Sequence, residues 1–260
     1  MLFYLRIWWL CSLQSAKIAL ESRFGVVLFL IGKTLRFLLF LLFILFITIR
    51  VEQIAGYTVW EMVLFFAAFN LVDDISQLCF REVYRFRKSV VSGDFDYTLT
   101  KPISPLFRSL LGGVDILDLP LFFLSVALLI FALVNMQNTS FLYIGTFLLL
   151  MGNALLIATA VHIFVLALGI LTTEVDNTLW LYRDLAQMGR IPVDVYKEPL
   201  RGFITFVIPV GIMMTFPAKA LMGMLSLQHM LLAFVIGGVL LLFAFQFWKF
   251  SLKRYASASS

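Results

Sequence analysis

The feature that most constrains this chain is an apolar run over residues 24–49. Its strongly polar side chains are Lys33, Thr34, Arg36 and Thr48. Because a helix rises about 1.5 Å per residue, the run is long enough to cross a hydrocarbon core roughly 30 Å thick. Hydrophobic residues make up 62% of the chain and charged residues 13%, whereas a soluble globular domain has roughly 25% charged residues. The sequence therefore predicts a membrane protein.

Similar apolar runs recur along the chain and predict six spans. They fall at residues 24–49, 57–78, 110–134, 141–171, 202–216 and 230–250. The expected fold class is all-α, a polytopic membrane protein in which residues 1–260 form a single domain. The fifth span is shorter than a bilayer requires. It also contains Pro209, which lacks a backbone donor and should kink or break the helix.

The distribution of Lys and Arg predicts the orientation. If both termini are cytoplasmic, sixteen basic residues fall in cytoplasmic segments, including the loops 81–109 and 172–201. Only Arg50 and Lys219 then fall outside, while Lys33 and Arg36 lie in the first span, near its inner end. We therefore interpret the net charge of +5 as the signature of a multi-pass cell-membrane protein and not of nucleic-acid binding.

Residues 1–23 are expected to form an interfacial helix. Arg6 divides their apolar stretch and no small-residue cleavage site follows, so they do not fit a cleavable signal peptide. On a helical wheel Arg6 and Lys17 share one face and Trp8 lies opposite, as in a helix that lies flat on a membrane. The alternative is an irregular flank of the first span.

No catalytic, cofactor or metal site is predicted on this chain. Gly32 begins a Gly-Lys-Thr triplet like the end of a phosphate-binding loop, but Gly25 precedes it by seven positions where the motif requires five. His162 and His229 are the only histidines, and neither has Cys, Asp or Glu at metal-ligand spacing. His162 lies in the middle of the fourth span, where a packing role and a substrate contact are both open.

The loop after the second span is the most informative. Residues 81–91 form a basic amphipathic stretch, followed by Gly93, a typical helix stop. Asp94 and Asp96 come next, and an extended segment with two X-Pro pairs is expected after them. The basic residues alone fit orientation-setting charges beside anionic lipid. They do not explain the ordered Gly, Asp and Pro pattern that continues the loop.

Three segments carry a resemblance to a known family. They are SGDFDYTLTKPISPLFR, LRGFITFVIPVGIMMTFPAKALMG and the terminal FWKFSLKRYASASS. In order and spacing they resemble the membrane (permease) subunit of bacterial ATP-binding-cassette transporters of the type-two permease family. The resemblance covers nearly the whole chain. It implies a cytoplasmic coupling helix at residues 82–93 that docks on a separate ATPase, with a site formed by Glu82, Tyr84, Arg85, Arg87, Lys88, Gly93, Asp94 and Asp96.

The resemblance also implies the assembly. Two permeases, either two copies of this chain or this chain with a similar permease, would pair with two ABC ATPase subunits that bind ATP and magnesium. The other expected partner is membrane lipid, and no nucleic acid is expected. A short re-entrant segment is implied on the outer side after the fifth span, near Pro217. Ordinary kinking without a gating role is the alternative for Pro209 and Pro217.

Acidic residues in or near the spans are candidates for a transport pathway. They are Asp73, Asp74, Asp115 and Asp118. The interpretation that we prefer is that they pair at the membrane surface with Arg81, Arg85 or Arg108.

Two other functions remain as alternatives. A stand-alone secondary transporter would show two similar halves with matching broken helices, and a membrane-bound lipid enzyme would show clustered catalytic residues. The sequence shows neither pattern, so an exporter permease is the leading prediction.

Overall fold

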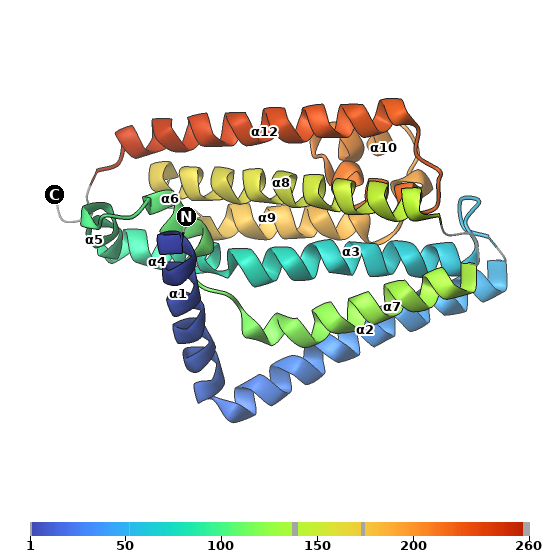
Figure 1. Cartoon of the computed structure of the whole chain (residues 1–260), viewed down its shortest axis with the longest axis horizontal. Helices are drawn as coiled ribbons and strands as arrows, with labels where there is room; N and C mark the ends of the chain where they lie inside the picture. Colours follow the sequence, from blue (N-terminus) through green and yellow to red (C-terminus); the bar gives the residue numbers. More distant parts are fainter. Residues whose placement is uncertain (1, 52, 137–139, 173–174, 257–260) are drawn as a thin grey trace.

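The computed structural model describes residues 2–51, 53–136, 140–172 and 175–256, and these ranges contain helices but no β-strand (Figure 1). Within them, five helical segments are long and apolar enough to cross a membrane, namely Arg23–Val51, Val59–Val91, Pro105–Met136, Phe141–Thr172 and Leu227–Lys253. A sixth candidate, Leu200–Val207 with Gly211–Leu221, is bent by 80°. The predicted all-α polytopic membrane fold is confirmed.

The first helix, α1 (Leu2–Glu21), runs across one end of the bundle while the long helices run along it (Figure 1). None of its described residues is buried. Tyr4 holds it in place, because its hydroxyl accepts a hydrogen bond from the Ser104 amide at 3.3 Å and its ring lies edge-on to Phe107, with centroids 4.8 Å apart. This placement is what an interfacial helix on a membrane surface requires.

The centre of the bundle is formed by α3 (Val59–Phe80) and α8 (Phe141–Thr172). α3 packs against α2 (Arg23–Val51), α7 (Leu119–Met136) and α8, and α12 (Leu227–Lys253) packs along α8. Every residue of α3 from Met62 to Val72 is buried. α2 is peripheral, because it buries Phe37, Ile44 and Thr48 and leaves most of its other side chains at the surface.

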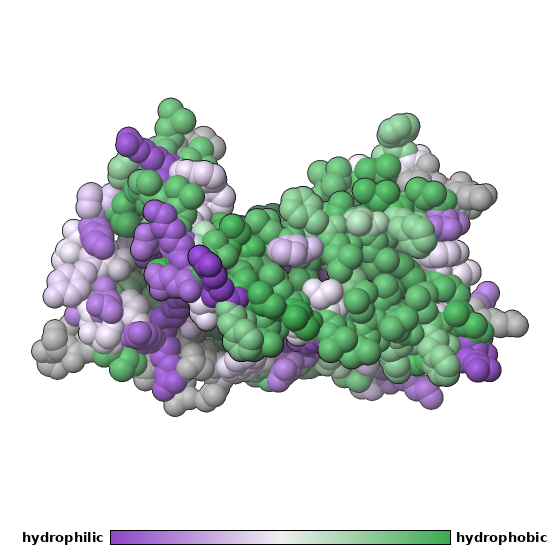
Figure 2. All heavy atoms as spheres, turned by 90° about the horizontal axis from the view of Figure 1, so that it is seen from below, coloured by the Kyte–Doolittle hydropathy of each residue, from purple (hydrophilic) through white to green (hydrophobic). Residues whose placement is uncertain are grey.

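The outer surface of the bundle is strongly apolar. Leu39, Leu42 and Phe46 of α2 are each more than half exposed. Figure 2 shows a broad apolar band between two more polar ends. A continuous apolar surface of this extent fits contact with lipid, where every backbone polar group is satisfied inside the helices.

The fifth passage along the bundle differs from the predicted one. α9 (Val175–Gln187) runs back beside α8 (Figure 1) and leads into the short turns η3 (Met188–Arg190) and η4 (Val193–Val195). Asp194 then accepts a 2.8 Å hydrogen bond from Tyr57, which lies in the connection between α2 and α3, at the far end of the bundle. The prediction of residues 172–201 as one cytoplasmic loop is therefore wrong. Polar residues such as Arg183 and Asp184 interrupt α9, so it lacks the apolar run by which spans are recognised.

Residues 200–221 form a bent hairpin at the same far end. Its first arm is α10 (Leu200–Gly202) with the π-helical turn η5 (Phe203–Val207), and its second is η6 (Gly211–Thr215) with α11 (Phe216–Leu221). The 80° bend falls at Pro209, which cannot donate a backbone hydrogen bond. Arg201 of the first arm and Lys219 of the second line one cavity, so both arms return to the same end. The predicted fifth span, residues 202–216, is thus part of a re-entrant segment that begins earlier than expected.

Within the described residues, six helices therefore run along the bundle. α2, α3, α7, α8 and α12 belong to segments long and apolar enough to cross a membrane, and α9 is shorter and more polar. Because the number of these helices is even, both termini lie at one end of the bundle, as Figure 1 shows. The structure places Lys197 and Arg201 at the far end, with Arg50 and Lys219, and not in a cytoplasmic loop as predicted. Arg190 lies within the bundle, over the rings of Phe40 and Phe69. Thirteen of the sixteen basic residues therefore remain at the end with the termini, so the charge bias that predicted the orientation persists.

Candidate functional site

Four short helical segments between α3 and α7 cover the end of the bundle that carries the termini. They are η1 (Arg81–Arg85), α4 (Phe86–Val91), α5 (Asp94–Thr100) and α6 (Pro105–Leu111). Gly93 has a φ of 78°, a left-handed conformation that favours glycine, and it ends α4 where the sequence predicts a stop. The first part of the segment predicted to be extended, up to Thr100, is helical instead, whereas Lys101 and Ser104, each before a proline, are extended as expected. Asp94 and Asp96 lie in the first turn of α5, where free backbone N–H groups stabilise carboxylates.

Aromatic side chains anchor α4 and α5 to the end of α12. The rings of Phe86 and Phe95 pack edge to face with centroids 5.1 Å apart, and Trp248 lies 6.4 and 6.5 Å from them. Tyr255 stands edge-on to Phe95 at 5.2 Å and donates its hydroxyl to Asp96 at 2.9 Å. Burial, aided by this hydrogen bond, raises the pKa of Tyr255 to about 12. The contacts join α4 and α5 mechanically to a membrane-spanning helix.

An open groove of about 540 Å³ lies between η1, α4, α5 and α6. Charged side chains dominate its lining, namely Glu82, Arg85, Lys88, Asp94, Lys101 and Arg108. The Glu82 carboxylate lies 3.5 Å from the guanidinium groups of both Arg85 and Arg108. More cations than carboxylates line the groove, so it suits a partner surface with acidic residues.

The predicted coupling residues fall into two groups. Arg85, Arg87, Lys88 and Asp94 are exposed at the surface of this end. Tyr84 instead turns inward, and its hydroxyl accepts a 3.1 Å hydrogen bond from Gln77 of α3. Asp96 is likewise held by Tyr255. The exposed group is available to a partner protein, while the other group fixes the segment to the bundle.

The four acidic candidates near the spans have different partners. Asp115 pairs with Arg81, with Nε 3.1 Å from Oδ2. Asp118 forms an ion pair with Lys33 of α2, so the expected pairing with an arginine is wrong for Asp118. The other two acidic candidates, Asp73 and Asp74, lie in α3. Asp74 accepts a hydrogen bond from the Ser125 hydroxyl at 2.8 Å, and Asp73 lines a small cavity within the bundle. Lys33 is 85 positions from Asp118 in sequence, and no local pattern indicates that pairing.

The remaining candidate residues are His162, in α8, and Pro217, in α11. His162 is buried with Nδ1 2.7 Å from the Ala158 carbonyl oxygen, and its ring lies 4.7 Å from Phe80 and 5.4 Å from Tyr182. Pro217 occupies the first turn of α11, where a missing N–H costs little. Among the described residues no group of three or more His, Cys, Asp or Glu side chains is placed to hold a metal ion.

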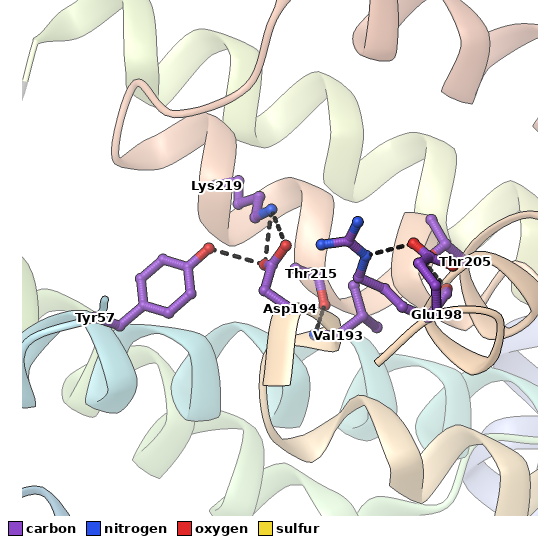
Figure 3. Close-up of polar contacts among 8 residues, drawn as sticks. Tyr57, Val193, Asp194, Glu198, Thr205, Thr215 and Lys219 are labelled. Atoms are coloured by element: carbon purple, nitrogen blue, oxygen red, sulfur yellow. Dashed lines mark hydrogen bonds and ion pairs between the residues drawn. The ribbon is translucent and has the colours of Figure 1, made fainter. Parts of the chain in front are cut away.

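A second polar cluster, which the sequence analysis missed, lies at the far end (Figure 3). Asp194 accepts hydrogen bonds from Tyr57 at 2.8 Å and from Lys219 at 2.8 Å. Burial opposes ionisation of Asp194, but these two hydrogen bonds together with the positive charges of Lys219 and Arg201 outweigh it and lower its pKa. The cluster ties the bent hairpin to the connection between α2 and α3. Its members are far apart in sequence and belong to no motif, so the sequence gives no signal for it.

Comparison with known families identifies the chain. A family model described as "ABC-2 family transporter protein" matches residues 34–259, from the middle of α2 through α12. No curated protein and no solved structure gives a significant match. The matched range contains the charged segments that follow α3 and the bent hairpin. The chain therefore belongs to the ABC-2 transporter family and is a membrane-spanning permease component of an ABC transporter.

Proposed function

We propose that this permease exports its substrate with energy from ATP hydrolysed by a separate ABC ATPase, and that the exposed face of α4 docks on that ATPase. The end that carries the termini then faces the cytoplasm, in keeping with its thirteen basic residues. Since the chain has no phosphate-binding loop, ATP and magnesium bind to the partner.

One observation carries this proposal, namely that α4 is exposed on one side and fixed on the other. Arg87 and Lys88 project from its exposed side, whereas Phe86 and Val90 are buried against the bundle. α4 contacts both α8 and α9, and its partner α5 is bonded to the end of α12. Work can pass from a closing ATPase to membrane helices only through such a rigid element.

We further propose that two permeases form the pathway, either two copies of this chain or this chain with a similar permease. α2 supports this arrangement, because it buries few of its side chains within one chain and presents a long apolar face. Two ATPase subunits would then complete an assembly with one α4 for each.

The experiment is affinity purification of the tagged chain from native membranes. Wild-type protein should bring down an ABC ATPase, and the charge reversal Arg85→Glu with Arg87→Glu should reduce its recovery by about tenfold. A matched control reverses Lys197 and Arg201, two basic residues at the far end, and should leave recovery unchanged. Size-exclusion profiles verify that each variant is folded. Equal recovery of the ATPase with all three proteins would refute the docking site.

A further inference from the structure

An arginine lies close to the middle of the membrane-spanning helix α2. Arg36 is exposed there, and its Nη2 donates a 3.2 Å hydrogen bond to Gln187 of α9. The sequence predicts a position near the inner end of its span, so Arg36 lies deeper along α2 than expected. Arg190 follows α9 on η3, and its guanidinium lies over the rings of Phe40 and Phe69, 5.0 and 5.7 Å from their centroids. Both rings belong to the central parts of α2 and α3, so the two arginines lie about midway along these helices, at membrane depth.

These two arginines lack an anionic partner within the described residues. Neither Arg36 nor Arg190 has a carboxylate within 4.0 Å there, whereas Lys33, one turn away from Arg36, is neutralised by Asp118. The Nε of Arg190 is also buried without a hydrogen-bond partner in the same ranges. An arginine stays charged in proteins, and such a charge at membrane depth is costly and typical of a transport pathway. An anion from outside the chain would satisfy both side chains.

Two cavities meet at Arg36 and Arg190. The first holds about 50 Å³, enough for a few water molecules or one small oxyanion. Its basic side chains outnumber its two carboxylates, Asp73 and Asp74; they are Lys33, Arg36, Arg183 and Arg190. The second is an open groove of about 420 Å³ along α2, lined otherwise by Gly32, Leu35, Leu39, Phe40 and Phe43. The two cavities share Arg36, Phe40 and Arg190. A cationic pocket that opens into an apolar groove matches a molecule with an anionic head and a hydrocarbon chain.

We propose that this cationic pocket and groove bind an amphiphile with one anionic head group, such as a long-chain phosphate monoester. The head group lies between Arg36 and Arg190, and the chain lies along the groove on α2. A free phosphate ion lacks the chain and leaves the groove empty, so it binds far more weakly. As the substrate class of an exporter, this inference rests on the proposed function. Binding itself requires no ATPase and can be measured separately.

The test measures binding of dodecyl phosphate to the purified full-length chain by native mass spectrometry. The double variant Arg36→Gln with Arg190→Gln should bind at least about tenfold more weakly. Arg201→Gln, at the far end, should bind like wild type. Inorganic phosphate and an uncharged dodecyl ether should fail to compete. Equal affinity of wild type and double variant, or equal competition by the uncharged ether, would overturn the proposal, and equal competition by inorganic phosphate would overturn its amphiphile part.

A second measurement uses only the wild-type protein. Dodecyl phosphate with a photoreactive diazirine at the end of its chain should label residues of the groove between positions 32 and 43. Labelling confined to other helices would refute the site even if the double variant fails to fold. If wild-type protein recovers the ATPase but does not bind dodecyl phosphate, this site alone is wrong. If it binds dodecyl phosphate but recovers no ATPase, the docking proposal alone is wrong.

Discussion

The ion pair between Asp194 and Lys219 holds the bent hairpin against the far end of the bundle. Replacing Asp194 by Asn keeps the size of the side chain but removes the charge to which Lys219 and Tyr57 donate. The side chains of Lys219 and Asp194 are only 18% and 22% exposed, so solvent screens their interaction less than that of a surface pair. A hydrogen bond to a charged group contributes about 1.5–3 kcal/mol. We therefore expect Asp194→Asn to lower the free energy of unfolding by about 2 kcal/mol.

Two further variants, Tyr57→Phe and Glu198→Gln, give reference values for this change in the free energy of unfolding. Tyr57→Phe removes one donor to the charged Asp194 and should lower the free energy of unfolding by about 1.5 kcal/mol. The double variant should lose less than the sum, because both changes act on the same carboxylate. Glu198→Gln is the matched control. Glu198 also pairs with an arginine, at 2.8 Å from Arg201, but its side chain is 57% exposed, so solvent screens the pair and its substitution should cause no measurable change.

The assay is reversible unfolding in mixed detergent micelles at several pH values. Because the folded pKa of Asp194 lies below its ordinary value of 3.8, its stabilisation is fully present above that value and is lost as the pH falls through the lower folded pKa. Wild type and Asp194→Asn should differ at pH 7 and converge in strong acid. If Asp194→Asn were as stable as Glu198→Gln at pH 7, the assigned role of this cluster would be wrong.

Three other predictions concern the opposite end and the topology. Phe95→Ala should lower the free energy of unfolding by about 3–5 kcal/mol because its ring is fully buried, while Tyr97→Ala, at an exposed position, should be neutral in the same assay. The folded pKa of Tyr255 is about 12 against an ordinary value of 10.0, so its contribution is complete below pH 10 and is lost as the pH rises to 12; Trp248 fluorescence should report this change in wild type and not in Tyr255→Phe. In a background without Cys11 and Cys79, an impermeant external reagent should label Lys197→Cys but not Ser92→Cys, and the reverse pattern would invert the topology.

Apolar runs predict most of the fold because lipid-facing and buried helices are both apolar. The spans at α2, α3, α7, α8 and α12 follow directly from them. α9 could not be found this way, because polar residues such as Arg183 and Asp184 interrupt its apolar side chains. The hairpin was then mistaken for the missing span. Pro209 nevertheless marked the position of its bend.

The candidate site was predictable to the extent that its signal is local. Gly93 indicated the end of α4, and the basic residues before it indicated an exposed helix. The contacts that fix this segment are not local: Asp96 and Tyr255 are 159 positions apart. The same holds for Arg36 and Arg190, whose proximity depends on how α9 packs along α8 and how η3 then packs on α3. Tertiary pairing of this kind leaves no spacing pattern in a single sequence.

Reconstitution in liposomes tests the central claim most directly, because it shows which energy source this permease uses. Purified chain alone should hydrolyse no ATP and transport no substrate under a proton or sodium gradient. Addition of the co-purified ABC ATPase with ATP and magnesium should start transport, and Arg85→Glu with Arg87→Glu should abolish it. Gradient-driven transport by the chain alone, without ATP or a second protein, would contradict the account and identify a secondary transporter.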